Sequence, residues 1–228
     1  MKTKAIAFFL LLGSFSFAQQ SPDMASMMAN KVDAAQVPDA YPFTWKYKMD
    51  LNTDGKSFQA DYLLEPNAKY FGMNMSQSGN DVTMVMDTNK KLTVMGFGKG
   101  AQKMGMATKM RDYLSTGNKE GAQKFAYKSL PDKTILGYKC KGVEASNTEM
   151  TMVFYFTNEA PVNFVDWFKA PGAQKIPDAF GAYFKPGDKP LVLSMEFTDK
   201  ANGKKTSMQC VALEKNAFTF KKSDYKFM

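Results

Sequence analysis

The sequence predicts an α+β fold: one long, curved antiparallel β-sheet, shaped as a half-barrel, with a few short helices covering one face. Two observations support this prediction. Most of the chain alternates apolar and polar residues with the period of two that strands require. Turn-forming residues separate the alternating runs, as in an antiparallel meander. The helices are expected in 98–121 and 158–184, where this alternation is lost.

The clearest strand is 43–51, in which every second residue is apolar, so that one face lies in the core and the other in water. Segment 58–64 continues the alternation as its hairpin partner. The same pattern predicts further strands at 70–75, 82–86, 92–97, 125–130, 139–145, 150–156, 191–198, 205–213 and 218–220.

Two segments have a different character. Segment 98–121 has glycines near its start and methionines spaced among polar residues, which indicates a short helix or an ordered flap. Segment 158–184 carries several aromatic residues punctuated by prolines, which indicates one or two short helices joined by loops.

The first 18 residues have the pattern of a cleaved secretory signal peptide. Lys2 and Lys4 precede an apolar run, and Ser16 and Ala18 place small residues where signal peptidase cleaves. The apolar run is shorter than the roughly 20 residues that span a bilayer, which disfavours a membrane anchor, and a buried N-terminal helix is the other alternative. No Cys follows it, so we expect a periplasmic or secreted protein that is not lipid-anchored.

The expected domain organisation has three parts. Residues 1–18 form the signal peptide, and residues 19–42 form a flexible or loosely docked leader that is rich in Ala, Met, Gln and Pro. Residues 43–228 form a single antiparallel β-rich domain. This length is sufficient for one sizeable core.

The two cysteines, Cys140 and Cys210, are an even pair in an exported chain, where oxidation is permitted. We expect one disulfide between them. Two buried free thiols are the alternative.

Composition excludes several classes of function. The chain has no histidine, which removes Ser/His/Asp triads, Cys/His pairs and the usual zinc sites. Arg111 is its single arginine, and the lysines are spread along the chain, so nucleic-acid recognition is not expected despite a net charge of +8. We predict no catalytic residues, no metal site and no cofactor.

Methionine is the unusual feature, with 18 residues, many in Met-x-Met pairs. A pair at i and i+2 on a strand lies on one face. The thioethers are suited to Cu(I), which soft sulfur ligands select. We favour the alternative that they fill a core or line an adaptable apolar cavity, because the chain has no histidine and the pairs lie in ordinary alternating strands.

The aromatic residues have a similar pair of interpretations. Most are expected in the core, but a subset would line a concave surface that binds a lipid or peptide. The candidate ligand-binding residues are Trp45, Tyr47, Met84, Met86, Met152, Phe154 and Trp167. The segment around Trp167 would act as the lid.

Four sequence elements together resemble an exported bacterial family known as domain of unknown function 4412. They are Ile135-Leu136-Gly137-Tyr138-Lys139-Cys140-Lys141-Gly142, Tyr70-Phe71-Gly72-Met73, Val82-Thr83-Met84-Val85-Met86-Asp87 and Lys222-Ser223-Asp224-Tyr225-Lys226. The resemblance covers nearly the whole mature chain and implies no known activity or site. The family is similar in fold to periplasmic lipoprotein carriers, which hold acyl chains and rely on an arginine inside the cavity. Arg111 lies in a polar segment, which argues against lipoprotein transport itself.

These observations favour a non-enzymatic exported binding or carrier protein for a hydrophobic ligand, such as an acyl chain or another lipid. The alternatives are a structural or interaction protein of the cell envelope with a filled core and, third, a Met-rich Cu(I)-binding protein. The sequence names no protein partner.

Overall fold

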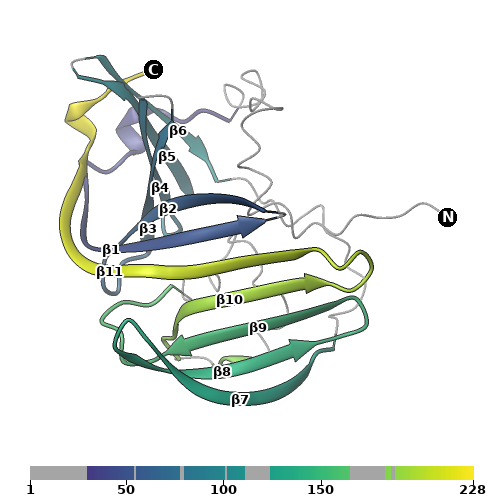
Figure 1. Ribbon diagram of the computed structural model, residues 1–228. Helices are drawn as coiled ribbons and strands as arrows, with labels where there is room; N and C mark the ends of the chain where they lie inside the picture. Colours follow the sequence, from purple (N-terminus) through teal and green to yellow (C-terminus); the bar gives the residue numbers. More distant parts are fainter. Residues whose placement is uncertain are drawn as a thin grey trace.

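The computed structural model describes residues 30–53, 55–77, 80–100, 102–110, 124–164, 183–185 and 188–228. These residues form one sheet of 12 strands in the order β12-β6-β5-β4-β3-β2-β1-β11-β10-β9-β8-β7. Neighbouring strands are antiparallel except β12 and β6, which are parallel. The sheet is open and bends so that β7–β10 and β3–β6 run in different directions (Figure 1).

The strands are β1 (Ala40–Thr53), β2 (Lys56–Leu64), β3 (Tyr70–Gln77), β4 (Asn80–Asp87), β5 (Leu92–Lys99), β6 (Gln102–Lys109), β7 (Ala126–Ile135), β8 (Tyr138–Ser146), β9 (Met150–Thr157), β10 (Leu191–Asp199), β11 (Lys205–Lys221) and β12 (Lys226–Phe227). Two 3-10 turns, η2 (Ala34–Gln36) and η3 (Lys222–Asp224), precede β1 and β12.

The α+β assignment is wrong. In the described ranges, helical structure is confined to the two three-residue 3-10 turns and the single residue Tyr183, and the rest of the regular structure is strand. The part of 98–121 that is described contains strand β6 instead of a helix. Its alternation was hidden because Gly105 and Ala107 occupy one face; Gly105 leaves room for the Phe227 ring, which lies 2.6 Å from where a Cβ would be. Residues 111–123 and 165–182 lie outside the described ranges, so the expected helices there cannot be placed.

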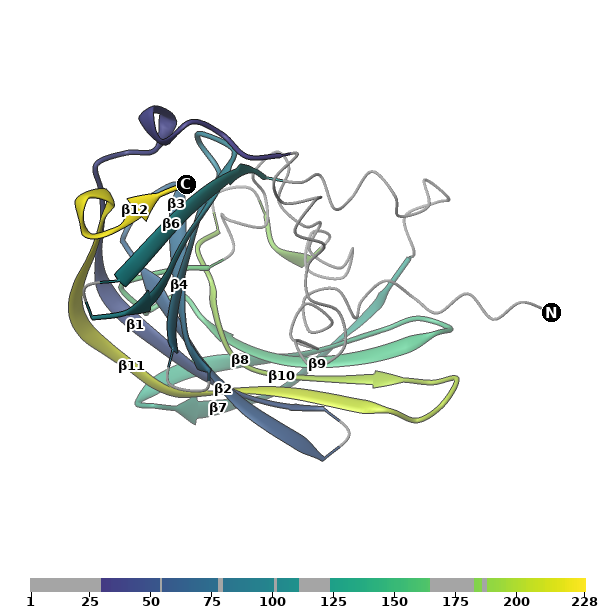
Figure 2. The same ribbon diagram turned by 90° about the horizontal axis from the view of Figure 1, so that it is seen from above.

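β1 and β11 link the two parts of the sheet. They form the longest pairing, from Ala40–Lys221 to Thr53–Thr206, and carry two register shifts, between Phe43 and Trp45 and between Lys48 and Met49. Such bulges bend and twist a strand pair. Figure 2 shows the consequence: β11 curves round the outside of the molecule before the chain reaches β12.

One core cluster lies on the outer face of β3–β6. A row in direct register runs across the strands here: Leu63, Gly72, Val85, Val94 and Ala107. Packed on this row are the bent ends of β1 and β11 and the terminal segments, through Val32, Val37, Tyr41, Phe43, Phe220, Tyr225 and Phe227. The opposite face of β3–β6 therefore looks into the curve of the sheet.

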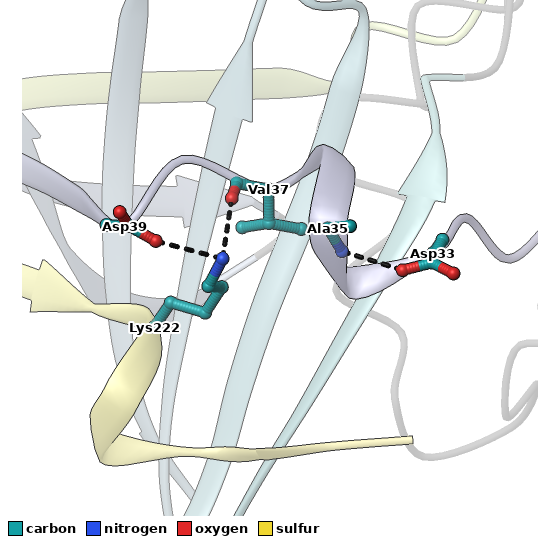
Figure 3. A network of polar contacts seen from close by, with 5 residues as sticks. All are labelled: Asp33, Ala35, Val37, Asp39 and Lys222. Carbon is teal, nitrogen blue, oxygen red and sulfur yellow. Dashed lines mark hydrogen bonds and ion pairs between the residues drawn. The ribbon is translucent and has the colours of Figure 1, made fainter.

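A polar network fastens the two terminal segments to each other on this outer side (Figure 3). The Lys222 ammonium donates to the Val37 carbonyl oxygen at 3.2 Å and forms an ion pair with Asp39 at 2.9 Å. Asp33 caps η2 by accepting a hydrogen bond from the Ala35 amide at 2.7 Å. Strand β1 thus begins at Ala40 on a docked segment, where Val32 and Val37 are buried.

Candidate functional site

A row of four methionines crosses the inner face of β3–β6. Met73 on β3 pairs with Met84 on β4, Met84 with Met95 on β5, and Met95 with Met106 on β6. Directly paired residues share a face and have Cβ atoms about 5 Å apart, so four thioether side chains lie side by side. Met84 and Met95 are half-buried, while Met73 and Met106 are buried.

Two flanking rows make this surface wider. One consists of Met75, Val82, Phe97 and Met104, and the other of Phe71, Met86, Thr93 and Thr108. We call these three rows the methionine face. The predicted ligand-binding residues Met84 and Met86 both belong to it, and apart from the two threonines it is apolar throughout.

The methionine face continues into an aromatic region on β2 and β1. Met73 pairs with Tyr62, and Tyr62 pairs with Tyr47. Phe164 covers this region, with ring centroids 5.2 Å from Tyr62, 5.3 Å from Phe71 and 6.0 Å from Tyr47. The predicted residue Tyr47 therefore contacts core side chains and is only 3% exposed.

The two tyrosines remain neutral because of this burial. The Tyr47 hydroxyl donates a hydrogen bond to the Val192 carbonyl oxygen, and burial raises the pKa of Tyr47 well above its usual value. Burial also raises the pKa of Tyr62 to about 12. These hydroxyls are hydrogen-bonding groups and provide no acid or base near neutral pH.

The predicted residues Met152 and Phe154 occupy the other end of the sheet. The register connects Phe154 through Met195 and Met208 to Leu51, which shares a face of β1 with Tyr47. Both predicted residues are 0% exposed, in a cluster with Phe156 and Phe184. They are on the same face as the methionines but fill a core, so the structure does not bring them to an open surface.

Trp45 is partly buried beside the main core cluster, with the Lys215 ammonium 6.0 Å from its ring centroid. Trp167 lies outside the described residues, so its role in a lid stays a prediction.

The expected disulfide is not formed. Cys140 and Cys210 are free, buried thiols on β8 and β11, which are separated in the sheet by β9 and β10. Each donates a weak hydrogen bond to a backbone oxygen, Cys140 to Tyr138 at 3.5 Å and Cys210 to Ala212 at 3.4 Å. Burial raises the pKa of both, that of Cys210 to about 12, so neither thiol is activated.

A polar pocket adjoins the methionine face at the turn between β2 and β3. Its volume is about 200 Å³, and its lining includes Leu64, Glu65, Lys69, Phe71, Phe164 and Lys189. The turn follows from Glu65-Pro66-Asn67-Ala68: Pro suits the second position, and Asn67 adopts φ 61° at the third, as in a type II turn. The Ala68 amide donates to the Glu65 carbonyl oxygen at 3.2 Å and closes it.

Sequence reasoning missed this pocket and the contribution of Met95. The Pro-Asn turn signal was present in the sequence, but nothing local indicates that Phe164 and Lys189 reach the same turn. The partners of Met95 depend on strand register, which single strands do not reveal.

Within the described residues, no three His, Cys, Asp or Glu side chains are grouped to hold a metal. The same residues include no helix with the length and apolarity to cross a bilayer.

No protein-family model matches the chain, and no curated protein sequence matches it. The resemblance to domain of unknown function 4412 therefore stays a prediction.

Three solved structures illustrate the matches found by shape. PNGF-II aligns with a TM-score of 0.35 at 13% identity, over 82% of this chain and 30% of that one. MucB in complex with MucA(peri) aligns with a TM-score of 0.35 at 6% identity, over 85% and 56%. A proposed outer membrane lipoprotein-sorting protein domain from Vibrio parahaemolyticus aligns with a TM-score of 0.21 at 10% identity, over 85% and 90%.

This chain spans under a third of PNGF-II and little more than half of MucB. At such identities and TM-scores these matches carry no conclusion about what this chain binds or does, which has to come from the site itself.

Proposed function

We propose that this is an exported, non-enzymatic binding or carrier protein whose methionine face holds a hydrophobic ligand such as an acyl chain. The observation that supports this is the in-register row Met73–Met84–Met95–Met106, whose middle members are half-buried inside the curve of the sheet. Flexible thioethers adapt to irregular apolar shapes, which suits a ligand of variable length or branching.

The expected affinity follows from the apolar area involved. Burying about ten methylene groups contributes about 8 kcal/mol at ~0.8 kcal/mol each. That corresponds to a Kd of about 1 μM before the cost of ordering the ligand. Micromolar binding is therefore the strongest that a chain lying on this face alone would give.

The test is displacement of a fluorescent fatty acid from the full chain by palmitate, with native mass spectrometry of protein isolated from its own periplasm. Met84→Gln combined with Met95→Gln is expected to weaken binding about tenfold or more. Met228→Gln is the matched control because Met228 is 38% exposed at the end of the chain, and it should bind normally. An empty protein that fails to bind the fatty acid would instead support a structural protein with a filled core.

Cu(I) binding is a second candidate, supported by the same row, because thioethers on adjacent strands meet side by side and soft sulfur selects this ion. Met84→Leu with Met95→Leu separates the two functions: it keeps the face apolar and removes two sulfurs. Under the carrier proposal fatty-acid binding survives this change. Under the same proposal, titration of the unaltered protein with Cu(I) against a competing chelator should give micromolar or weaker binding. Tight Cu(I) binding that is lost in the double Leu variant would favour the copper-binding function.

A further inference from the structure

The polar pocket between β2 and β3 is too small for a whole ligand. Its volume of about 200 Å³ lies below the 300–1,000 Å³ typical of pockets that enclose a small molecule. An occupant would therefore place one group in the pocket and the rest of its length outside it.

Glu65 leaves a hydrogen-bonding position unfilled there. Its Oε2 is buried and has no hydrogen-bond partner. A buried polar atom without a partner costs about 1–3 kcal/mol, and more when charged. Glu65 itself lines the pocket, so turning its carboxylate towards the pocket would let a ligand N–H or O–H donor bind this oxygen and remove that penalty.

The other charged residues of the lining are both cationic. Lys69 and Lys189 contribute to the wall, and the Lys189 ammonium donates to the Asn67 side-chain oxygen at 3.0 Å. One carboxylate beside two ammonium groups favours a ligand group that carries both a positive and a negative charge. A purely cationic group would be repelled by the two lysines, and a purely anionic group would be repelled by Glu65.

The pocket shares Phe71 with the methionine face. Phe71 and Phe164 line it, and Phe71 is in direct register with Met86 on the methionine face. We infer that the pocket holds the amine-and-phosphate head group of a zwitterionic lipid, the ammonium at Glu65 and the phosphate at the two lysines, while the acyl chain lies on the methionine face. This inference rests on the proposed function.

The experiment compares two ligands with the same acyl chain in the full-length protein. Lysophosphatidylethanolamine carries the amine and the phosphate, while lysophosphatidic acid carries the phosphate alone. The first should displace the fluorescent fatty acid at about tenfold lower concentration, the gain expected from a hydrogen bond to a charged group. Glu65→Gln should abolish this preference, whereas the control Glu196→Gln, at an exposed ion pair on β10, should keep it.

Lys189→Met provides an independent variant, expected to weaken both phosphate-bearing ligands by a similar factor. Equal affinity of the two lysolipids, or a preference that persists in Glu65→Gln, would overturn the head-group assignment while palmitate binding still supports the carrier. Failure of all three ligands to bind the unaltered protein would overturn the proposed function itself.

Discussion

The same face of the sheet is covered to different extents at its two ends. On β8–β10 the face is filled: Phe154 and Met152 are 0% exposed, and the Phe184 ring lies 6.0 Å from Phe154 and 4.8 Å from Phe156. On β3–β6 the corresponding face carries half-buried methionines. Apolar side chains alone therefore do not distinguish a filled core from a partly exposed face in this protein; what packs against them does.

The reverse side of the methionine face is also packed. It is the cluster of Val85, Val94 and Ala107, covered by aromatic residues of β1, β11 and the C-terminal segment. Under the carrier proposal, this packing would help the face to accept a ligand without collapsing. Four experiments test this difference between the two ends of the sheet.

The largest difference in the free energy of unfolding should appear between two Met→Ala substitutions, one at each end of the sheet. Met152→Ala removes a fully buried side chain and is expected to lower the free energy of unfolding by about 2–5 kcal/mol. Met84→Ala should cost about 1 kcal/mol, because a half-buried side chain loses less apolar contact. Urea denaturation measures both. Equal losses would mean that the methionine face is as filled as the other end.

Gly96→Ala tests the backing of the methionine face. A Cβ there would lie 2.3 Å from the Tyr225 ring and 2.8 Å from the Phe220 ring, and these two rings stack at 4.6 Å. Overpacking should cost about 1–3 kcal/mol and release the C-terminal segment to limited proteolysis. Thr93→Ala, on the same strand but facing the methionines, is the control. Protection equal to that of the unaltered chain would show that the rings move aside freely.

The pH dependence of stability tests the burial of Cys210, which belongs to the same core cluster as Tyr47 and Leu51. Its pKa is about 12 in the folded protein and near 9 when unfolded, so its contribution to stability is complete below pH 9 and is lost as pH rises towards 12. Cys210→Ala should flatten the fall in stability measured between pH 9 and pH 11. Both thiols should resist alkylation at pH 8 in the native state and react once denatured, and rapid native labelling would contradict this burial.

The smallest effect is expected from the ion pair between Lys46 and Glu214, where β1 and β11 bend. The two groups are 2.7 Å apart, but Glu214 has a side chain that is 50% exposed. Lys46→Met should cost less than about 1 kcal/mol, with the difference shrinking as salt is added. A loss comparable with Met152→Ala would mean that charge, and not apolar packing, holds the bend.

Much of the fold was predictable because the alternation of apolar and polar residues in a strand is visible in the local sequence. The alternation around Tyr47, Met49 and Leu51 identified β1 and its buried face, and the Met-x-Met pairs placed Met84 and Met86 on one face. β6 was not predicted because its outer positions are the small residues Gly105 and Ala107, and the ring of Phe227 packs against Gly105. No local pattern reports such a distant partner.

The sequence by itself determined which residues share a face on the strands that it predicted, the absence of imidazole chemistry and the unusual supply of thioethers. Only the tertiary structure decided the rest, because register and bulges join strands that are distant in sequence. It aligned Met73, Met84, Met95 and Met106, placed β9 and β10 between the strands of Cys140 and Cys210, and brought Lys189 to the turn at Glu65. Side-chain period is local, whereas pairing partners and the covering of a face are properties of the whole sheet.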